Sequence, residues 1–132
     1  MNIQQVNTLV SNLYLAVDSK DADYLSIHLA ENTAFRIGNH PLVTNKKDIL
    51  AANNQFFSSI DSMRHTIEEV VYQNDTITDL TKISCHGRVD YVRLDGTKHS
   101  AVFSTFLCVR DELIVDYLVF ADLSDLSDLS GL

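Results

Sequence analysis

The sequence predicts an α+β fold in which three helices precede a long antiparallel sheet and pack on one of its faces. Apolar residues recur with a helical period in the first part of the chain and with a period of two from residue 63 onward. The dipeptide Asp95-Gly96 lies between two alternating stretches and is a strong hairpin signal. With 132 residues, 45% of them hydrophobic, the chain is long enough for one domain with its own core.

Three segments have the apolar spacing of a helix: residues 2–19, 22–29 and 45–59. Asp21 is a suitable N-cap for the second of them. Residues 33–37 are rich in β-favouring types and predict a short strand. Pro41 disfavours helix at His40, so residues 38–41 are expected to form a loop.

The sheet is completed by four predicted strands: residues 63–73, 76–94, 98–109 and 113–122. The strand at 76–94 is too long to stay flat, so we expect a bulge within it. Residues 123–132 repeat Leu-Ser-Asp and are expected to form a polar tail after a single domain of residues 1–122.

The predicted turns decide which side chains share a face of the sheet. A two-residue turn at Asp95-Gly96 places Arg88 opposite Phe103, and a three-residue loop at 110–112 places Phe103 opposite Val119. One face then holds His86, Arg88, Asp90, Val92, Ala101, Phe103, Thr105, Tyr117, Val119 and Ala121. The other face holds Cys85, Val89, Tyr91, Val102, Phe106, Cys108, Ile114, Leu118 and Phe120. Three helices cover only one face, so the second face predicts a homodimer built sheet to sheet.

Composition excludes several classes of function. The formal net charge of −8 argues against nucleic acid and anionic membranes as partners, because both require a basic surface. The first residues lack the basic flank and cleavage motif of a signal peptide, so we expect a cytoplasmic protein. Cys85 and Cys108 lie among apolar residues and are expected to be reduced core thiols. Neither zinc-ligand spacing nor a phosphate-binding loop occurs, so we expect no metal and no cofactor.

The order and spacing of these elements resemble the nuclear-transport-factor-2-like superfamily, in its SnoaL-like branch. The resemblance rests on the helix pair around residues 19–23, the strand and loop of 35–41, and the closing strand 113–123 with Asp122. It implies a conical, cystatin-like α+β barrel whose curved sheet encloses a deep, mostly apolar pocket, and commonly a homodimer. Members include isomerases, cyclases, dehydratases and epoxide hydrolases, so the fold does not fix the function.

One short motif resembles a particular group of these enzymes. Arg88-Val89-Asp90 is similar to the Arg-x-Asp strand of limonene-epoxide-hydrolase-like proteins, which implies that Asp90 is a general acid and Arg88 its partner. Asn39 is similar to a water-positioning Asn of that group. The water-activating Asp is replaced by Val119, which removes the base of that reaction.

The candidate catalytic residues are therefore Asp90, Arg88 and His65, with no metal ligands. The candidate ligand-binding residues are Tyr14, which matches an oxyanion-binding Tyr of ketosteroid isomerases, and Asn39, Met63, Phe103, Tyr117 and Val119. The hypothesis is a pocket for a small lipophilic molecule, with proton transfer by an isomerase, cyclase or dehydratase. Two alternatives stay open. One is a non-catalytic binding or dimerisation module, in which Arg88 and Asp90 face solvent; the other is an epoxide hydrolase with an altered catalytic set.

Overall fold

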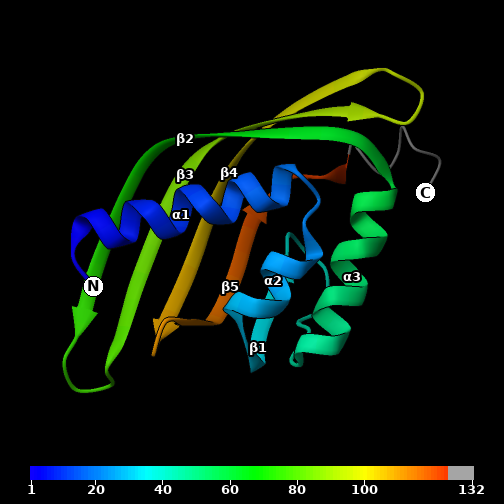
Figure 1. Ribbon diagram of the computed structural model, residues 1–132. Coiled ribbons are helices and arrows are strands. Elements are labelled where there is room, and N and C mark those ends of the chain that lie inside the picture. Colours follow the sequence, from blue (N-terminus) through cyan, green and yellow to red (C-terminus); the bar gives the residue numbers. More distant parts are fainter. Residues whose placement is uncertain (125–132) are drawn as a thin grey trace.

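The computed structural model describes residues 1–124 and confirms the α+β class (Figure 1). Its sheet has the strand order β1-β5-β4-β3-β2, with β1 parallel to β5 and every other pair antiparallel. The sheet is strongly curved but open, because β1 and β2 are free edges, so the predicted barrel does not close. The elements are α1 (Ile3–Asp18), α2 (Ala22–His28), β1 (Leu29–Ile37), α3 (Lys46–Ser58), β2 (Ile60–Asp75), β3 (Leu80–Arg93), β4 (Lys98–Arg110) and β5 (Leu113–Ala121).

Polar caps fix where the helices begin. The Asn2 side chain accepts a hydrogen bond from the Gln5 amide at 2.8 Å, and the Gln5 side chain accepts one from the Asn2 amide at 2.9 Å. This capping box satisfies amide groups that a helix start would otherwise leave unpaired. Asp21 caps α2, as predicted, and Asn45 caps α3. Residues 125–132, which make up most of the predicted tail, lie outside the described residues.

The helices cover the concave face of the sheet. α1 crosses β2, β3 and β4 and buries Val6, Val10, Leu13 and Val17 against them (Figure 1). α3 stands at the end of the sheet where β2 begins, and contacts both β1 and β2. The core therefore lies between α1, α3 and the inner surface of the curved sheet. Within residues 1–124, no helix is both long and apolar enough to cross a membrane.

The curvature of the long strands comes from bulges in β2. The β2–β3 register shifts between Ile60 and Ser62 and again between Ile67 and Glu69, and each shift adds one residue to β2. The predicted bulge in residues 76–94 was therefore wrong, because the extra residues lie on the neighbouring strand. Gly87 of β3 lies beside the second bulge, where a Cβ would come within 1.9 Å of the Thr66 carbonyl oxygen. Only glycine allows β2 to approach so closely.

The loop at Asp95-Gly96 is one residue longer than predicted, and this reverses the faces of β3. The Arg93 amide donates to the Thr97 carbonyl at 2.8 Å, so residues 94–96 form a three-residue loop with Gly96 at φ +86°. Val89 consequently pairs with Ala101, whereas Arg88 pairs with Val102 and Asp90 with Ser100. The predicted face for His86, Arg88, Asp90 and Val92 was wrong: the first three are exposed on the outer surface, and Cys85, Val89 and Tyr91 point inward.

The last hairpin differs from the prediction in loop length and in one bulge, and the two differences together leave the side chains after the bulge on the predicted faces. The loop holds two residues, Asp111 and Glu112, rather than three, and both have positive φ, as in a type I′ turn. A bulge then adds Val115 to β5 and restores the alternation. Phe103 pairs with Ala121 rather than with Val119, yet Phe103, Thr105, Tyr117, Val119 and Ala121 share the inner face, as predicted.

A tyrosine-lined cavity with a buried His–Asp pair

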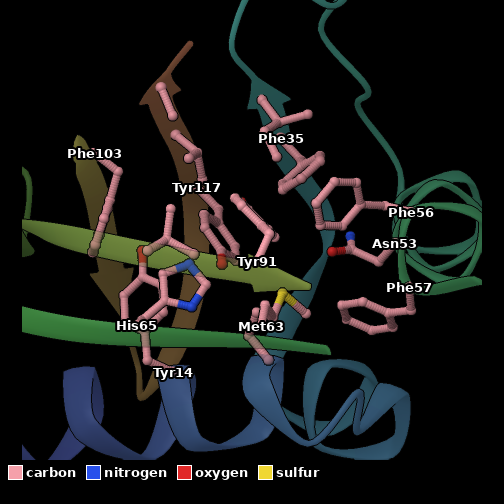
Figure 2. A pocket seen from close by; sticks show the side chains of 15 residues that line it. Tyr14, Phe35, Asn53, Phe56, Phe57, Met63, His65, Tyr91, Phe103 and Tyr117 are labelled. Atoms are coloured by element: carbon pink, nitrogen blue, oxygen red, sulfur yellow. The ribbon is translucent and has the colours of Figure 1, made fainter. Parts of the chain in front are cut away.

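A cavity lies between α1, α3 and the concave face of the sheet, and Figure 2 shows its side chains. Helices α1 and α3 and all five strands contribute to its wall. The wall is mostly aromatic and aliphatic, with a few polar groups. The enclosed volume is only about 30 Å³, the space of one or two water molecules. Side chains of the wall must therefore move before a larger molecule can enter.

His65 lines the cavity and is hydrogen-bonded to Asp18, which lies behind the wall. Asp18 is the last residue of α1, and His65 lies in β2. The Asp18 carboxylate accepts a hydrogen bond from the His65 amide at 2.9 Å and contacts His65 Nδ1 at 2.6 Å. The His65 side chain is 8% exposed and that of Asp18 20%. A carboxylate at Nδ1 favours the tautomer with a proton there and leaves Nε2 as the basic atom.

Aromatic rings pack around this imidazole. The Tyr14 ring centroid lies 4.5 Å from that of His65, and the Phe103 ring meets His65 edge-on at 5.1 Å. The Tyr14 hydroxyl is hydrogen-bonded to the hydroxyl of Thr105, which is fully buried on β4. Figure 2 shows these rings together at one end of the cavity, from α1, β2 and β4.

Buried phenols supply hydrogen-bond donors to the wall of the cavity. Burial raises the pKa of Tyr14 well above its usual value, and it also raises the pKa of Tyr117 and of Tyr91. Each phenol therefore stays protonated at neutral pH and can donate a hydrogen bond to a ligand oxygen. A basic nitrogen and hydrogen-bond donors therefore face the same cavity.

The opposite end of the cavity is formed by α3 and β1. Phe35, Phe56 and Phe57 close it, and Phe35 meets Tyr117 edge-on at 5.2 Å. The Asn53 side-chain nitrogen donates to the Ile49 carbonyl at 2.9 Å. Figure 2 shows the amide oxygen of Asn53 directed into the cavity, where it can accept a hydrogen bond.

The structure brings most of the predicted site residues together. Residues that line the cavity are Tyr14, Met63, His65, Phe103, Tyr117 and Val119. Three others lie elsewhere. Asn39 is exposed in the loop after β1, and Arg88 and Asp90 are exposed on the outer face, where Asp90 accepts a hydrogen bond from Ser100 at 2.5 Å. The Arg-x-Asp pair therefore does not contact the cavity.

Sequence reasoning missed Asp18 and Asn53. Asp18 falls within the first predicted helix, residues 2–19, and its contact with His65 spans 47 residues, so no local pattern could reveal it. Asn53 did leave a signal, because it is a polar residue four positions after Ile49 on the buried side of α3. Within residues 1–124, no group of three or more His, Cys, Asp or Glu side chains is arranged to hold a metal ion. Cys85 and Cys108 are buried free thiols, and burial raises the pKa of each to about 11.

Comparison with solved structures agrees with this architecture. A SnoaL-like protein from Jannaschia sp. CCS1, whose name proposes a polyketide cyclase, is 15% identical, with a TM-score of 0.78 over 98% of this chain and 94% of that one. A Streptomyces avermitilis protein, whose name proposes a dehydratase of the NTF2-like family, is 11% identical, with a TM-score of 0.80 over 92% and 97%. An LEH-like epoxide hydrolase from M. tuberculosis is 9% identical, with a TM-score of 0.75 over 95% and 88%. At such identities the likeness shows the fold alone.

Sequence comparison gives the family. No curated protein matches the chain. The SnoaL-like domain family matches residues 10–117, which is most of the chain and includes most of α1 and of the sheet. The chain therefore belongs to the SnoaL-like domain family and has the nuclear-transport-factor-2-like fold.

Proposed function

We propose that the cavity binds a small lipophilic molecule and that His65 moves a proton on it without a cofactor. The observation that carries this proposal is the contact between His65 and Asp18, which holds a basic imidazole at the wall of an apolar cavity. Nε2 of His65 has no hydrogen bond to any residue between 1 and 124, so it is available to a ligand.

The reaction class follows from the groups around His65. Nε2 would take a proton from carbon next to a ligand carbonyl, and the electron pair of that C–H bond would move onto the carbonyl oxygen. Tyr14 or Tyr117 would donate a hydrogen bond to the resulting enolate. The imidazolium, stabilised by Asp18, would return the proton to another atom of the ligand. Isomerisation, cyclisation and dehydration all contain this step.

The comparisons support this class without selecting one reaction. The Jannaschia and Streptomyces proteins are named for a cyclase and a dehydratase, and both reactions transfer protons. The epoxide-hydrolase alternative has less support, because Arg88 and Asp90 lie on the outer face, away from the cavity.

The solvent-facing position of Arg88 and Asp90 supports the non-catalytic alternative. The outer face also carries exposed apolar side chains, with Val102 70% and Phe120 49% exposed. We propose that this face joins two copies of the chain, since such patches commonly mark interfaces. Homodimerisation is compatible with either a catalytic or a purely binding role for the cavity.

The test for catalysis is proton exchange on a bound ketone. Wild-type protein is mixed with α-tetralone in D₂O, and deuterium at its α-carbon is followed by NMR. We expect His65→Gln to slow the enzyme-dependent exchange by about 10²–10⁴-fold, the usual contribution of a general base. His86→Gln is the matched control, because that histidine is exposed on the outer face. If α-tetralone binds but wild type and His65→Gln exchange it at the same rate, the protein is a binding module.

A further inference from the structure

A second polar cluster lies on the inner face of the sheet, at the hairpin end beyond the cavity. Arg93 is two residues after Tyr91 on β3 and faces the same way, about 7 Å further along the strand. The residue is only 4% exposed. An arginine is almost never buried to this extent unless a partner carries the opposite charge.

The hydrogen bonds of Arg93 use only one part of its guanidinium. Nη1 donates to the Thr97 hydroxyl at 3.1 Å and to the Lys98 carbonyl at 3.0 Å. Nε is buried and has no partner among residues 1–124, and Arg93 forms no ion pair within this range. The edge that carries Nε and Nη2 therefore keeps two parallel donors without a partner in this range, and such an edge can bind a carboxylate or phosphate with two hydrogen bonds.

His99 adds a second unpaired group at the same place. It pairs with Tyr91 across β3 and β4, so it shares the inner face and is a diagonal neighbour of Arg93. Its ring stacks on Tyr91 at 6.2 Å, and its Nε2 is buried without a partner in the same range. Buried polar atoms without partners are uncommon in native proteins and call for an explanation.

This cluster adjoins the proposed ligand site. Tyr91 lines the cavity and stacks with His99, and Phe56 of the cavity meets Tyr91 edge-on at 6.1 Å. Lys20 brings a second cation to this end, because its ammonium binds the carbonyl of Ile60, the residue paired with Arg93. Asp95, on the hairpin loop, lies near enough to Arg93 for their charges to interact, but its carboxylate is fully exposed and accepts two hydrogen bonds from Thr97 rather than from Arg93.

We propose that Arg93 and His99 form an anion subsite that binds the carboxylate of the ligand whose apolar part occupies the cavity. The substrate class is thus a lipophilic carboxylic acid, and this assignment rests on the proposed function of the cavity. Arg93 fixes the acid group through its Nε–Nη2 edge, and His99 contributes a further hydrogen bond. Asp122 lies close enough to His99 for their charges to interact, and it opposes the bound anion.

The binding test compares two probes of equal chain length, decanoate and 1-decanol, by isothermal titration calorimetry on the full chain. We expect decanoate to bind wild type at least about tenfold more tightly, as charge-assisted hydrogen bonds predict. Arg93→Met should remove this preference, and Arg93→Lys should remove most of it, because lysine keeps the charge but lacks the planar fork. Asp122→Asn should tighten decanoate binding.

A second measurement separates the subsite from the cavity. Butyrate is titrated while the Nε–H signal of Arg93 is followed by NMR, with the signal assigned from its loss in Arg93→Lys. A saturable shift of this signal supports the subsite, whether or not decanol binds. Failure of decanol to bind would count against the cavity proposal but not against the subsite. The subsite is refuted if decanoate binds no more tightly than decanol and the Nε–H signal does not move. The cavity proposal then still stands, provided that decanol binds. The double variant Asp125→Asn/Asp128→Asn is measured without ligand. A shift of the Arg93 Nε–H signal in this variant would identify the chain's own acids as the partner of Arg93 and would also refute the subsite.

Discussion

Gly87→Ala tests whether the close approach of β2 to β3 holds the sheet in its curved form. The added Cβ would lie 1.9 Å from the Thr66 carbonyl oxygen, whereas ordinary van der Waals contact begins at 3.4 Å. Backbone atoms cannot rotate away, so the two strands would have to separate by roughly 1.5 Å. Ladder hydrogen bonds of about 2.9 Å would then exceed 4 Å and be lost.

The cost can be estimated from those hydrogen bonds. Losing two of them leaves at least two buried backbone groups unpaired at about 1–3 kcal/mol each, so we expect a cost of roughly 2–6 kcal/mol in total. That is a large part of the stability of a typical domain, about 5–15 kcal/mol. Gly87 also pairs with Phe103 of the cavity wall, so ligand affinity should fall together with stability.

The assay is urea unfolding followed by circular dichroism, with Gly96→Ala as the matched control. Gly96 has φ +86°, and no atom lies within 4 Å of the point that an added Cβ would occupy, so its cost of about 1 kcal/mol is purely conformational. If Gly87→Ala is no more destabilising than Gly96→Ala, the strands tolerate the methyl group and the reasoning is wrong.

Three further predictions follow from contacts described above. Asp18→Ala removes two hydrogen bonds to His65 and should lower the free energy of unfolding by about 3 kcal/mol; a change below about 0.5 kcal/mol in urea titrations would contradict this role. The pKa of about 11 for Cys85 and Cys108 lies above that of an unfolded thiol, about 8.5. The folded state therefore holds these protons more tightly, and its stability is complete below pH ~8.5 and falls as the pH rises toward 11. Replacing both thiols by Ala should flatten this alkaline decline in thermal melts, and an unchanged slope would show that other groups cause it. Val102→Glu places a charge on the outer apolar face and should convert a dimer into monomers in equilibrium sedimentation; a wild type that is itself monomeric at micromolar concentration would end the dimer proposal.

The fold and part of the site were predictable from local patterns. The change from helical to alternating periodicity gave the α+β class and the order of elements. Tyr14 was expected at the pocket from its match to a Tyr of ketosteroid isomerases, whereas His65, Phe103 and Tyr117 were expected there from the alternation along their strands, and all four line the cavity. The periodic patterns are local, and burial of one apolar face enforces them.

The errors came from single residues whose effect reaches far along a strand. Because side chains alternate with a period of two, one extra residue in the loop at 94–96 moved Arg88 and Asp90 to the outer face. Asp-Gly is compatible with both a two-residue and a three-residue hairpin loop, so the sequence alone could not choose between them. The Asp18–His65 contact joins a helix end to a distant strand and is set by the packing of α1 on the sheet, which has no local signature.

The small volume of the cavity has a kinetic consequence. A space of about 30 Å³ cannot admit a ligand of ten carbons, so the proposed binding would have to wait until side chains of the wall, such as Phe56 and Phe57, move aside. The observed rate of association should therefore stop rising at high ligand concentration and level off at the rate of that opening. Apparent affinity is reduced by the fraction of time spent closed. Trimming Phe56 to leucine would then speed ligand entry and exit together, while the chemistry at His65 would keep its own rate.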